Sequence, residues 1–417
     1  MNRVCVHWPR FGPYHLARLE AAHGLFAEQG VELIGLETAG RDATYAWRVE
    51  DGPTSFRREQ VFPDQTFEAI PPSEMHDGVT RTLDQLRPDA VAITSYSFPD
   101  ARASLVWCRR ARRTAVLMSA SREEDALRVR WREHFKSLLV RQYDAALVGG
   151  RAHRAYLERL GFPPSRIFLG YNAVDNDYFC RRAEAVRAGT SASRHLPGLD
   201  DENPFFLAVG RFTARKNLDG LLEAYNRYRA RTSEQGAEPW RLVLLGDGPE
   251  RSGLEKLIEG KKIGGVTLAG FRQIEETSAY YGRAAAFVHP AQADQWALVV
   301  NEAMAAGLPV LVSTGSGCAE DLVRDGENGY RFDPHAPDVL AEHLNRFATS
   351  ADLARMGQRS QEIIAAWSPR RFAEGLWEAV QAGRPHADRP LNPAVGAALW
   401  ALRKTARSAD AFHTVEA

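Results

Sequence analysis

Short apolar runs alternate with longer amphipathic stretches along the first half of the chain. Residues 3–8 (RVCVHW) are the first run, and a Gly-Pro turn separates them from a helix predicted over about 14–29 and ended by Gly30. Further strands are predicted at 31–38, 61–63, 90–96, 115–121, 145–150 and 166–175. This alternation predicts an α/β domain built on a parallel sheet.

The second half repeats the pattern after a polar stretch. Residues 181–204 are rich in Ala, Ser and Gly, so we interpret them as an interdomain connection. Strands are then predicted at 205–212, 241–249, 265–271, 284–290 and 308–314. The helix after the first of these has Asn217 as its predicted N-cap and one apolar stripe. Because 417 residues are many for one core, two similar α/β halves are expected.

Two carboxylates stand out in residues 289–313, HPAQADQWALVVNEAMAAGLPVLVS. Asp294 lies in the loop after an apolar strand, and Glu302 is predicted to open a short helix that Gly307 and Pro309 end. Both side chains are expected to face the same crevice. Carboxylates there can accept hydrogen bonds from the paired hydroxyls of a sugar or ribose, and a helix N-terminus nearby favours anions.

This stretch resembles the E-x7-E signature of the retaining glycosyltransferases of the GT-B fold, family 4 type. Asp294 stands at the first Glu of the signature, Glu302 stands at the second, and AMAAGLPVLVS continues the pattern. The chain departs from the family by having Asp for the first Glu and Ala297 where Gly is common. Residues 172–175, NAVD, resemble the family's NGVD segment.

The resemblance implies an α/β protein with two Rossmann-like doubly wound parallel-sheet domains that face each other across a cleft. Residues 1–180 would bind the acceptor, and residues 203–366 would bind the nucleotide sugar. The helix at 367–383 would cross back onto the first domain. Residues 384–417 would form a tail with a short helix at about 393–407.

The family's diphosphate-binding pair matches Arg211 and Lys216. Alone, two such cations are typical of a solvated surface, but together with the downstream signature they are predicted to stabilise the leaving diphosphate. With Asp294 and Glu302 they are the predicted catalytic residues. The predicted donor-binding residues are Gly12, Gly210, Gly246, Gly248, Gly270, Phe271, Arg272, Leu298, Val299, Ser316, Gly317 and Cys318.

Three of these donor-binding groups come from loops that resemble family loops. Residues 246–250, GDGPE, resemble a G-x-G turn, although a lone G-x-G is also typical of a tight turn. Residues 270–272 end a strand at the place where the family holds the base of the nucleotide. The alternative is that they are an ordinary strand end with no role in binding. Residues 315–320, GSGCAE, resemble a GG-x-P-E loop, with Ser316 for Gly and Ala319 for Pro. Its backbone N–H groups would approach the sugar and phosphate, the alternative being a flexible turn.

The first strand-to-helix loop supplies the predicted residues of the other domain. Gly12 lies where the resembling enzymes bring a glycine close to the donor phosphate. Tyr14 and His15 follow and are candidates for acceptor contact. A lone His at a helix start is typical of capping, with catalysis by His15 as the alternative. The His that the family often has after its fifth strand is replaced by residues 118–121, MSAS.

Retaining transfer in this family is generally thought to occur on the front face, with the leaving diphosphate oxygen taking the acceptor's proton. No side-chain nucleophile is then needed, and the sequence shows no Ser-His-Asp or Cys-His constellation. No DxD motif or His/Cys cluster indicates a metal site, so metal independence and no cofactor are predicted.

Composition narrows the partners and the compartment. Charge is balanced at 53 basic and 53 acidic residues, so no nucleic-acid partner is expected. The four cysteines show no C-x-x-C spacing, the N-terminus lacks an apolar signal region, and nowhere do about 18 apolar residues run together. We expect a cytoplasmic protein, either freely so or peripheral at the inner face of the cell membrane.

Residues 101–142 are locally basic, with 11 basic and 4 acidic side chains and hence a net charge of +7. Trp107, Trp131 and Phe135 are among the apolar residues interleaved with them. One interpretation is an amphipathic patch on anionic lipid, which would suit a lipid-linked acceptor. The alternative, which we favour, is two ordinary helices with solvated arginines.

The resemblance therefore predicts transfer of a hexose-type sugar from a UDP-sugar, or another nucleotide sugar, to a glycan or lipid-linked acceptor with retention. This implies a place in polysaccharide, lipopolysaccharide or glycolipid assembly. One rival hypothesis is an inactive sugar-nucleotide-binding scaffold of the same fold, suggested by Asp294, Ala297 and the replaced His. Another is a GT-B-fold epimerase, which would lack the D/E-x7-E loop. Arg211, Lys216 and Glu302 favour the enzyme.

Overall fold

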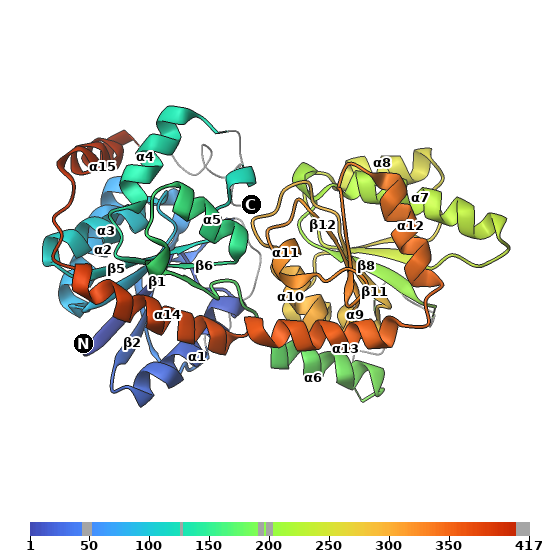
Figure 1. Cartoon of the computed structure of the whole chain (residues 1–417), viewed down its shortest axis with the longest axis horizontal. Coiled ribbons are helices and arrows are strands. Elements are labelled where there is room, and N and C mark those ends of the chain that lie inside the picture. Colours follow the sequence, from blue (N-terminus) through green and yellow to red (C-terminus); the bar gives the residue numbers. More distant parts are fainter. Residues whose placement is uncertain (44–51, 126–127, 191–195, 197–202, 406–417) are drawn as a thin grey trace. The chain divides into compact units, whose positions relative to one another are not determined.

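The computed structural model describes residues 1–43, 52–125, 128–190, 196 and 203–405, and the chain divides into two compact units. Unit 1 comprises Met1–Ala173 and Ser368–Ala417, and unit 2 comprises Val174–Trp367. Each unit has a parallel sheet with helices on both faces (Figure 1). The predicted class, two Rossmann-like doubly wound parallel sheets, is confirmed.

The sheet of unit 1 follows the order β3-β2-β1-β4-β5-β6-β7, and each neighbouring pair of strands is parallel. Its central strands are buried on both faces, which explains their continuous apolar runs. The strands are β1 (Arg3–Trp8), β2 (Glu32–Arg41), β3 (Arg57–Thr66), β4 (Ala90–Thr94), β5 (Thr114–Ser119), β6 (Ala145–Val148) and β7 (Ile167–Leu169). The helices between them are α1 (Pro13–Glu28), α2 (Pro72–Leu86), α3 (Pro99–Ala111), α4 (Arg130–Val140) and α5 (Arg151–Arg159).

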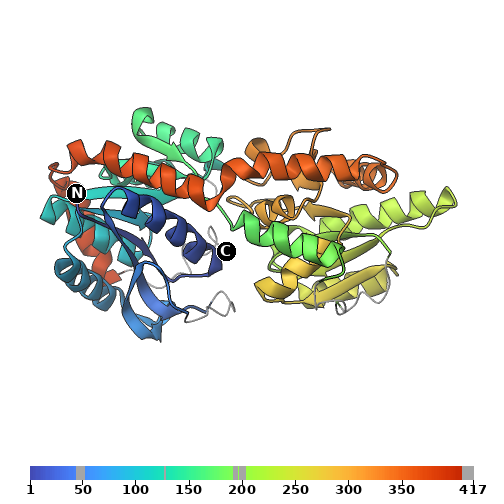
Figure 2. The same ribbon diagram turned by 90° about the horizontal axis from the view of Figure 1, so that it is seen from below.

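The C-terminal segment completes unit 1. Helix α14 (Pro369–Gly383) packs against α1 (Figure 2). The ring of Trp377 on α14 meets that of Phe26 on α1 edge-on, with 5.1 Å between the ring centroids. Helix α15 (Pro393–Thr405) packs on α2 and α3 and buries Val395 and Leu399 in the core. The part of the predicted tail that the structure describes therefore belongs to the packed domain.

The sheet of unit 2 follows the order β10-β9-β8-β11-β12-β13 and is also parallel. Helices α7, α8 and α12 cover one face, while α6, α9, α10 and α13 gather on the other (Figure 1). The strands are β8 (Phe205–Val209), β9 (Arg241–Leu245), β10 (Val266–Gly270), β11 (Ala286–His289), β12 (Val310–Ser313) and β13 (Gly329–Phe332). The helices are α6 (Asn176–Arg187), α7 (Leu218–Glu234), α8 (Arg251–Gly260), α9 (Ile274–Arg283), α10 (Leu298–Ala305), α11 (Ala319–Leu322), α12 (Pro337–Ala348) and α13 (Leu353–Ile364).

Helix α6 changes the predicted boundary between the domains. The prediction placed the boundary at residue 180, inside this helix, and took residues from 181 onward as an irregular connection. Instead α6 packs against α9 and α10, with the Phe179 and Tyr281 rings at 6.0 Å, so it belongs to unit 2. The remaining predicted connection, 191–195 and 197–202, lies outside the described residues.

The structure differs from the prediction in two strands, and it places Asn217 at the predicted N-cap without a capping side chain. The strand predicted at 166–175 is only three residues long, and β13 was not predicted. Asn217 stands at the N-cap of α7, but its side chain makes no cap hydrogen bond. Its Nδ2 donates instead to the carbonyl oxygens of Pro290 and Pro334, so it joins loops.

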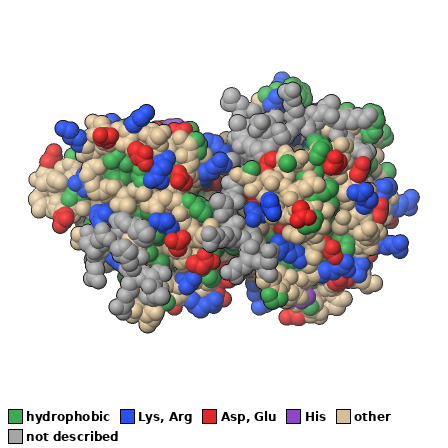
Figure 3. Space-filling model, turned by 180° about the vertical axis from the view of Figure 1, so that it is seen from behind, with side chains coloured by type: hydrophobic (Ala, Val, Ile, Leu, Met, Phe, Trp, Pro, Cys, Tyr) green, Lys and Arg blue, Asp and Glu red, His purple; other side chains and the backbone are tan. Residues whose placement is uncertain are grey.

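The surface drawn in Figure 3 shows Lys and Arg side chains interspersed with Asp and Glu on both units. Among the described residues, no helix combines the length and apolar character that crossing a membrane requires. Cys5, Cys108 and Cys318 are buried, and no disulfide joins the four cysteines.

Candidate active site

The candidate site lies where the strand order of the second sheet reverses. β8 and β11 are neighbours there although β9 and β10 intervene in sequence. The loops after these two strands therefore leave the same edge side by side, which is where doubly wound sheets bind ligands. One loop carries Arg211 and Lys216, and the other carries Asp294. The backbone joins the loops, since Gln292 N donates to Arg215 O at 2.8 Å.

Asp294 is the centre of the polar contacts at this point. Its Oδ2 accepts a hydrogen bond from Lys216 Nζ at 2.5 Å and lies 3.0 Å from His289 Nε2. Its Oδ1 accepts a hydrogen bond from Trp296 N at 3.3 Å. Burial alone would raise the pKa of Asp294, but Lys216 and His289 hold that pKa well below its usual range. The carboxylate is therefore ionised at neutral pH.

His289 is a site residue that the sequence prediction missed. It is the last residue of β11 and is only 2% exposed. Burial lowers the pKa of its imidazole, with Asp294 acting in the opposite direction. The neutral ring donates from Nε2 to the carboxylate, since an unprotonated nitrogen could not hydrogen-bond an anion. The available signal was a polar residue at the carboxyl end of an otherwise apolar strand.

Glu302 lies one turn inside α10 and does not open it as predicted. The helix begins earlier because Ala297, at its N-cap, takes a left-handed conformation with φ of +79°. Glu302 is 1% exposed, and its Oε2 accepts a hydrogen bond from Tyr281 OH on α9 at 2.8 Å. The start of α10 instead presents the N–H groups of Leu298 and Val299, which helix geometry leaves without an intrahelical acceptor.

The glycines after β9 allow two loops to approach each other closely. A Cβ at Gly246 would lie 1.9 Å from Gly210 O, and a Cβ at Gly248 would lie 2.4 Å from Phe212 O. Phe212 N also donates to Asp247 O at 2.9 Å. These glycines therefore form a tight turn beside the site, and this turn packs closely against the loop that carries Arg211.

The loop at 315–318 holds the Asp294 loop in place. Asp294 N donates to Gly315 O at 3.1 Å, and Gly317 N donates to Asp294 O at 2.9 Å. Cys318 N donates to Trp296 O at 3.2 Å, while Ser316 Oγ lies 3.2 Å from Ser313 Oγ. In this structure these N–H groups thus bond to the protein, and the contact between the two loops is what requires small residues.

The remaining predicted donor residues of unit 2 lie at the ends of neighbouring strands. Gly270 O accepts a hydrogen bond from Gly246 N at 2.9 Å, which ties the end of β10 to the turn after β9. Phe271 is 37% exposed, and the buried Arg272 Nε has no hydrogen-bond partner. Arg211 is exposed. A small pocket brings together three of the predicted residues, Gly210, Arg211 and Lys216. Its lining residues are Ala208, Val209, Gly210, Arg211, Phe212, Lys216, Leu218, His289 and Pro290.

Unit 1 holds the other predicted residues at the start of α1. Gly12 is the N-cap, and its N–H donates to His15 Nδ1 at 2.8 Å. Burial, and secondarily Arg18, lowers the pKa of His15 to about 3. A group with that pKa is a poor base at neutral pH, so the geometry favours the capping role. Tyr14 is partly exposed in the same first turn.

Comparisons with known proteins add to this geometry. Residues 191–362 match the family model described as Glycosyl transferases group 1. All four predicted catalytic residues, Arg211, Lys216, Asp294 and Glu302, lie inside that match. Over 242 residues the chain is 31% identical to sulfoquinovosyl transferase SQD2 of Arabidopsis thaliana. The matched region covers 58% of this chain and 42% of that protein. The chain spans about half the length of the curated relatives it matches.

Solved structures extend the likeness to both units. Sucrose-phosphate synthase of Thermosynechococcus elongatus has a TM-score of 0.66 and 20% identity, covering 90% of this chain and 98% of that one. HepE of Anabaena, in complex with UDP and glucose, has a TM-score of 0.66 and 15% identity, covering 92% of this chain and 100% of that one. The likeness shows that the fold is that of the GT-B proteins.

No group of three or more His, Cys, Asp and Glu residues that could hold a metal ion occurs in the part of the chain that the structure describes. Metal independence stays a prediction, to be tested with the donor.

Proposed function

We propose that this protein is a retaining glycosyltransferase that takes a hexose-type sugar from a nucleotide sugar. The observation that carries the proposal is the convergence of Lys216 and His289 on the Asp294 carboxylate, beside the Arg211 loop and within the segment that matches Glycosyl transferases group 1. The Anabaena structure that holds UDP and glucose makes a UDP-hexose the first donor to test.

Arg211 and Lys216 are the proposed partners of the donor diphosphate. The bond to the sugar breaks as negative charge develops on the leaving diphosphate, so fixed positive groups lower the barrier. Exposed Arg211 offers a planar fork of donors, and Lys216 offers a point charge already placed by Asp294. The first N–H groups of α10 add donors that favour an anion.

Asp294 and Glu302 are the proposed partners of hydroxyl groups. Asp294 keeps acceptor capacity on Oδ1, whose one hydrogen bond comes from Trp296 N at 3.3 Å. Glu302 is held by Tyr281 and is proposed to accept from the donor's ribose. In a front-face transfer the leaving oxygen takes the acceptor's proton, so retention requires no side-chain nucleophile. We propose that no metal ion takes part.

The first experiment is thermal stabilisation by UDP, GDP, ADP and their hexose conjugates without added metal. A ligand that binds only the folded protein raises its melting temperature according to its affinity. We expect one nucleotide and one conjugate to stabilise the wild type and to have no effect on Arg211→Ala/Lys216→Ala. If none stabilises the wild type at millimolar concentration, the proposed donor site is refuted.

A second experiment separates the enzyme from an inactive scaffold of the same fold. Glu302→Ala is expected to abolish donor binding, whereas Asp294→Ala is expected mainly to impair the choice of sugar. Transfer, or slow hydrolysis of the donor, is followed by release of the free nucleotide. Binding without turnover for every acceptor tried would favour the scaffold, and unimpaired turnover in both variants would refute the assignment.

For the acceptor, we propose a glycan or a lipid-linked sugar. The sequence alone favours solvated helices at 101–142, but two exposed apolar side chains in this segment lead us to propose peripheral contact with an anionic membrane. Trp131, at the start of α4, is 68% exposed, and Val129 beside it is 40% exposed. Sedimentation with phosphatidylcholine vesicles, with and without phosphatidylglycerol, tests this contact. Trp131→Ala should weaken binding to the anionic vesicles, and equal sedimentation of both proteins would contradict the proposed contact.

A further inference from the structure

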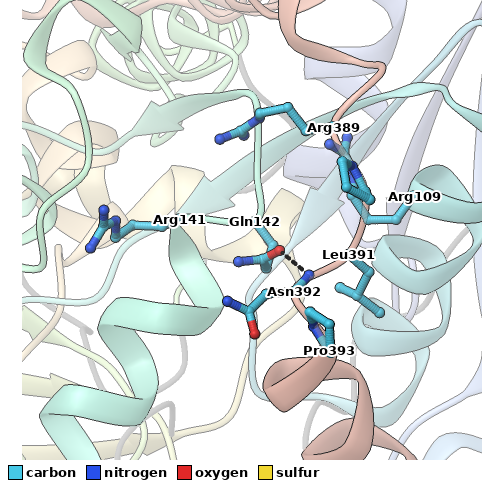
Figure 4. A pocket seen from close by; sticks show the side chains of 8 residues that line it. Arg109, Arg141, Gln142, Arg389, Leu391, Asn392 and Pro393 are labelled. Carbon is cyan, nitrogen blue, oxygen red and sulfur yellow. Dashed lines mark hydrogen bonds between the residues drawn. The ribbon is translucent and has the colours of Figure 1, made fainter.

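A second pocket lies in unit 1, at the edge of the sheet opposite to the loop that carries Gly12. It is a cavity of about 300 Å³, close to the lower size of small-molecule sites. Its lining comes from the ends of α3 and α4 and from the segment before α15 (Figure 4). The lining residues are Arg109, Arg141, Gln142, Arg389, Pro390, Leu391, Asn392 and Pro393.

We propose that this pocket binds the phosphate group of a small molecule or of a lipid. The inference goes beyond sugar transfer and does not rest on it. It rests on a lining that offers hydrogen-bond donors and positive charge from Arg109 and Arg389, on two separate segments, whereas the side chain of Arg141 extends away from the other lining residues (Figure 4). A phosphate presents more acceptor oxygens than a single carboxylate does, so it matches donors that arrive from several directions.

The positive charge in this region exceeds what the nearby carboxylate neutralises. Asp144 is fully buried, and Arg109 pairs with it, its Nη1 donating to Asp144 Oδ1 at 3.0 Å. Arg389 Nη2 lies 3.3 Å from the same oxygen. Arg166 Nη1 donates to the Asp144 carbonyl oxygen at 2.8 Å, which adds a further cation. Arg109, Arg166 and Arg389 thus surround one carboxylate among the described residues, so a net positive charge remains for a ligand.

Unused donors point to the same ligand chemistry. Arg109 Nε is buried and has no hydrogen-bond partner, which is costly unless a ligand or water accepts from it. Gln142 and Asn392 fix the rim, since Asn392 N donates to Gln142 Oε1 at 3.0 Å (Figure 4). Asn392 Oδ1 accepts from Ala394 N at 2.9 Å and so caps α15. The acceptors of the rim are thus occupied by the protein, whereas guanidinium donors remain.

The test measures phosphate binding separately from the candidate donor site. Arg211→Ala/Lys216→Ala serves as the reference protein because it lacks the cations proposed to bind the nucleotide diphosphate. Inorganic phosphate and pyrophosphate are titrated calorimetrically at constant ionic strength, with chloride as the competing salt. We expect saturable binding that weakens roughly tenfold to a hundredfold when Arg389→Gln is added.

Two further variants keep the result interpretable. Asn392→Asp retains the cap of α15, because Asp is an equally good N-cap, but it adds a negative charge to the lining. It should abolish phosphate binding while leaving the melting temperature nearly unchanged. Arg370→Gln removes an arginine of unit 1 that is 85% exposed and lies at the start of α14, whereas the end of that helix, Gly383, is the part close to Asp144. As the matched control it should bind phosphate like the reference protein.

A vesicle arm identifies the source of the phosphate. The same proteins are sedimented with phosphatidylcholine vesicles that contain phosphatidylglycerol. If Asn392→Asp loses vesicle binding, the group recognised is a lipid headgroup; if it loses only free phosphate, the ligand is a soluble phosphate compound. Equal phosphate binding by Asn392→Asp and the reference, or no binding of any probe by the reference, would overturn the proposal.

Discussion

At the scale of single residues, Lys216 and Asp294 depend on each other. Their side chains are only 20% and 14% exposed, so removing one partner leaves a poorly solvated charge. We expect Lys216→Met to lower the free energy of unfolding by about 3 kcal/mol, as for other broken buried pairs. Urea denaturation monitored by circular dichroism measures this loss.

A double-mutant cycle is the control for that pair. Adding Asp294→Asn to Lys216→Met removes the stranded charge, so the double variant should be more stable than Lys216→Met alone. Additive losses would mean that the hydrogen bond of 2.5 Å contributes little in solution.

Ala297 is a residue whose backbone conformation suits glycine better. Its φ of +79° is left-handed, which costs a residue with a Cβ about 1–2 kcal/mol. We therefore expect Ala297→Gly to leave stability unchanged or raise it by up to about 1 kcal/mol, although glycine loses more entropy on folding. The melting temperature of the purified variant checks this.

The matched control lies in the same helix. Ala303 is buried in the interior of α10, where glycine is unfavourable. Ala303→Gly should therefore destabilise the protein by about 1 kcal/mol. If both glycine variants lost similar stability, the left-handed conformation of Ala297 would not be what limits this loop.

At the scale of elements, two helices of unit 1 begin with the same arrangement. Gly12 N donates to His15 Nδ1 in α1, and Gly150 N donates to His153 Nδ1 in α5 at 3.0 Å. In each case a histidine at the third helical position occupies the place of the Glu or Gln of a capping box. The bond requires an unprotonated Nδ1, so such a cap is sensitive to acid.

We expect His15→Gln to reduce the acid sensitivity of unit 1. Burial lowers the pKa of His15 from 6.5 to about 3, so between these values the unfolded chain binds a proton that the folded chain does not. Stability from this residue is present above about pH 6.5 and is lost as the pH falls toward 3, by up to about 1.4 kcal/mol per pH unit. Glutamine keeps the cap without titrating.

The measurement is denaturant unfolding at a series of pH values. His15→Gln should show a shallower decline in unfolding free energy between about pH 6 and pH 4 than the wild type. His335→Gln, at an exposed histidine of unit 2, is the matched control and should follow the wild type. Parallel curves for all three proteins would contradict the assigned role of His15.

The elements that the sequence predicted best are those with continuous apolar runs. Strands buried on both faces, such as β6 and β8, are apolar throughout, so length and composition reveal them. β13, with the sequence GYRF, is partly exposed and carries too few apolar residues to show a run. α6 was not predicted, because few of its residues, among them Phe179 and Ala183, are buried and apolar.

The candidate site was predictable where one local motif carries it. Asp294 and Glu302 belong to a single stretch of sequence, so their spacing was informative. His289 and Tyr281 join them from β11 and α9 through tertiary packing, which no local spacing encodes. The backbone N–H groups of the loop at 315–318 were predicted to bind the donor. In this structure the N–H groups of Gly317 and Cys318 instead donate to the Asp294 loop, a contact that exists only once the sheet has folded.

At the scale of the whole molecule, the two units differ in how the chain builds them. Unit 2 is one continuous stretch, Val174–Trp367, with its own sheet and core, whereas unit 1 needs two separated segments. We therefore expect a fragment of residues 174–367 to fold alone. All predicted donor-site residues except Gly12 lie in it, so it should bind the nucleotide that stabilises the full chain, within about tenfold in affinity.

The same fragment should not transfer sugar, because the predicted acceptor site belongs to unit 1. Circular dichroism shows whether the fragment folds, and calorimetry measures its affinity for the nucleotide. Release of free nucleotide from the donor measures its turnover. Arg211→Ala/Lys216→Ala in the fragment is the control and should abolish binding. A folded fragment that binds no nucleotide, beside a full chain that does, would show that the donor site needs unit 1. The site at the reversal of the second sheet would then be incomplete by itself.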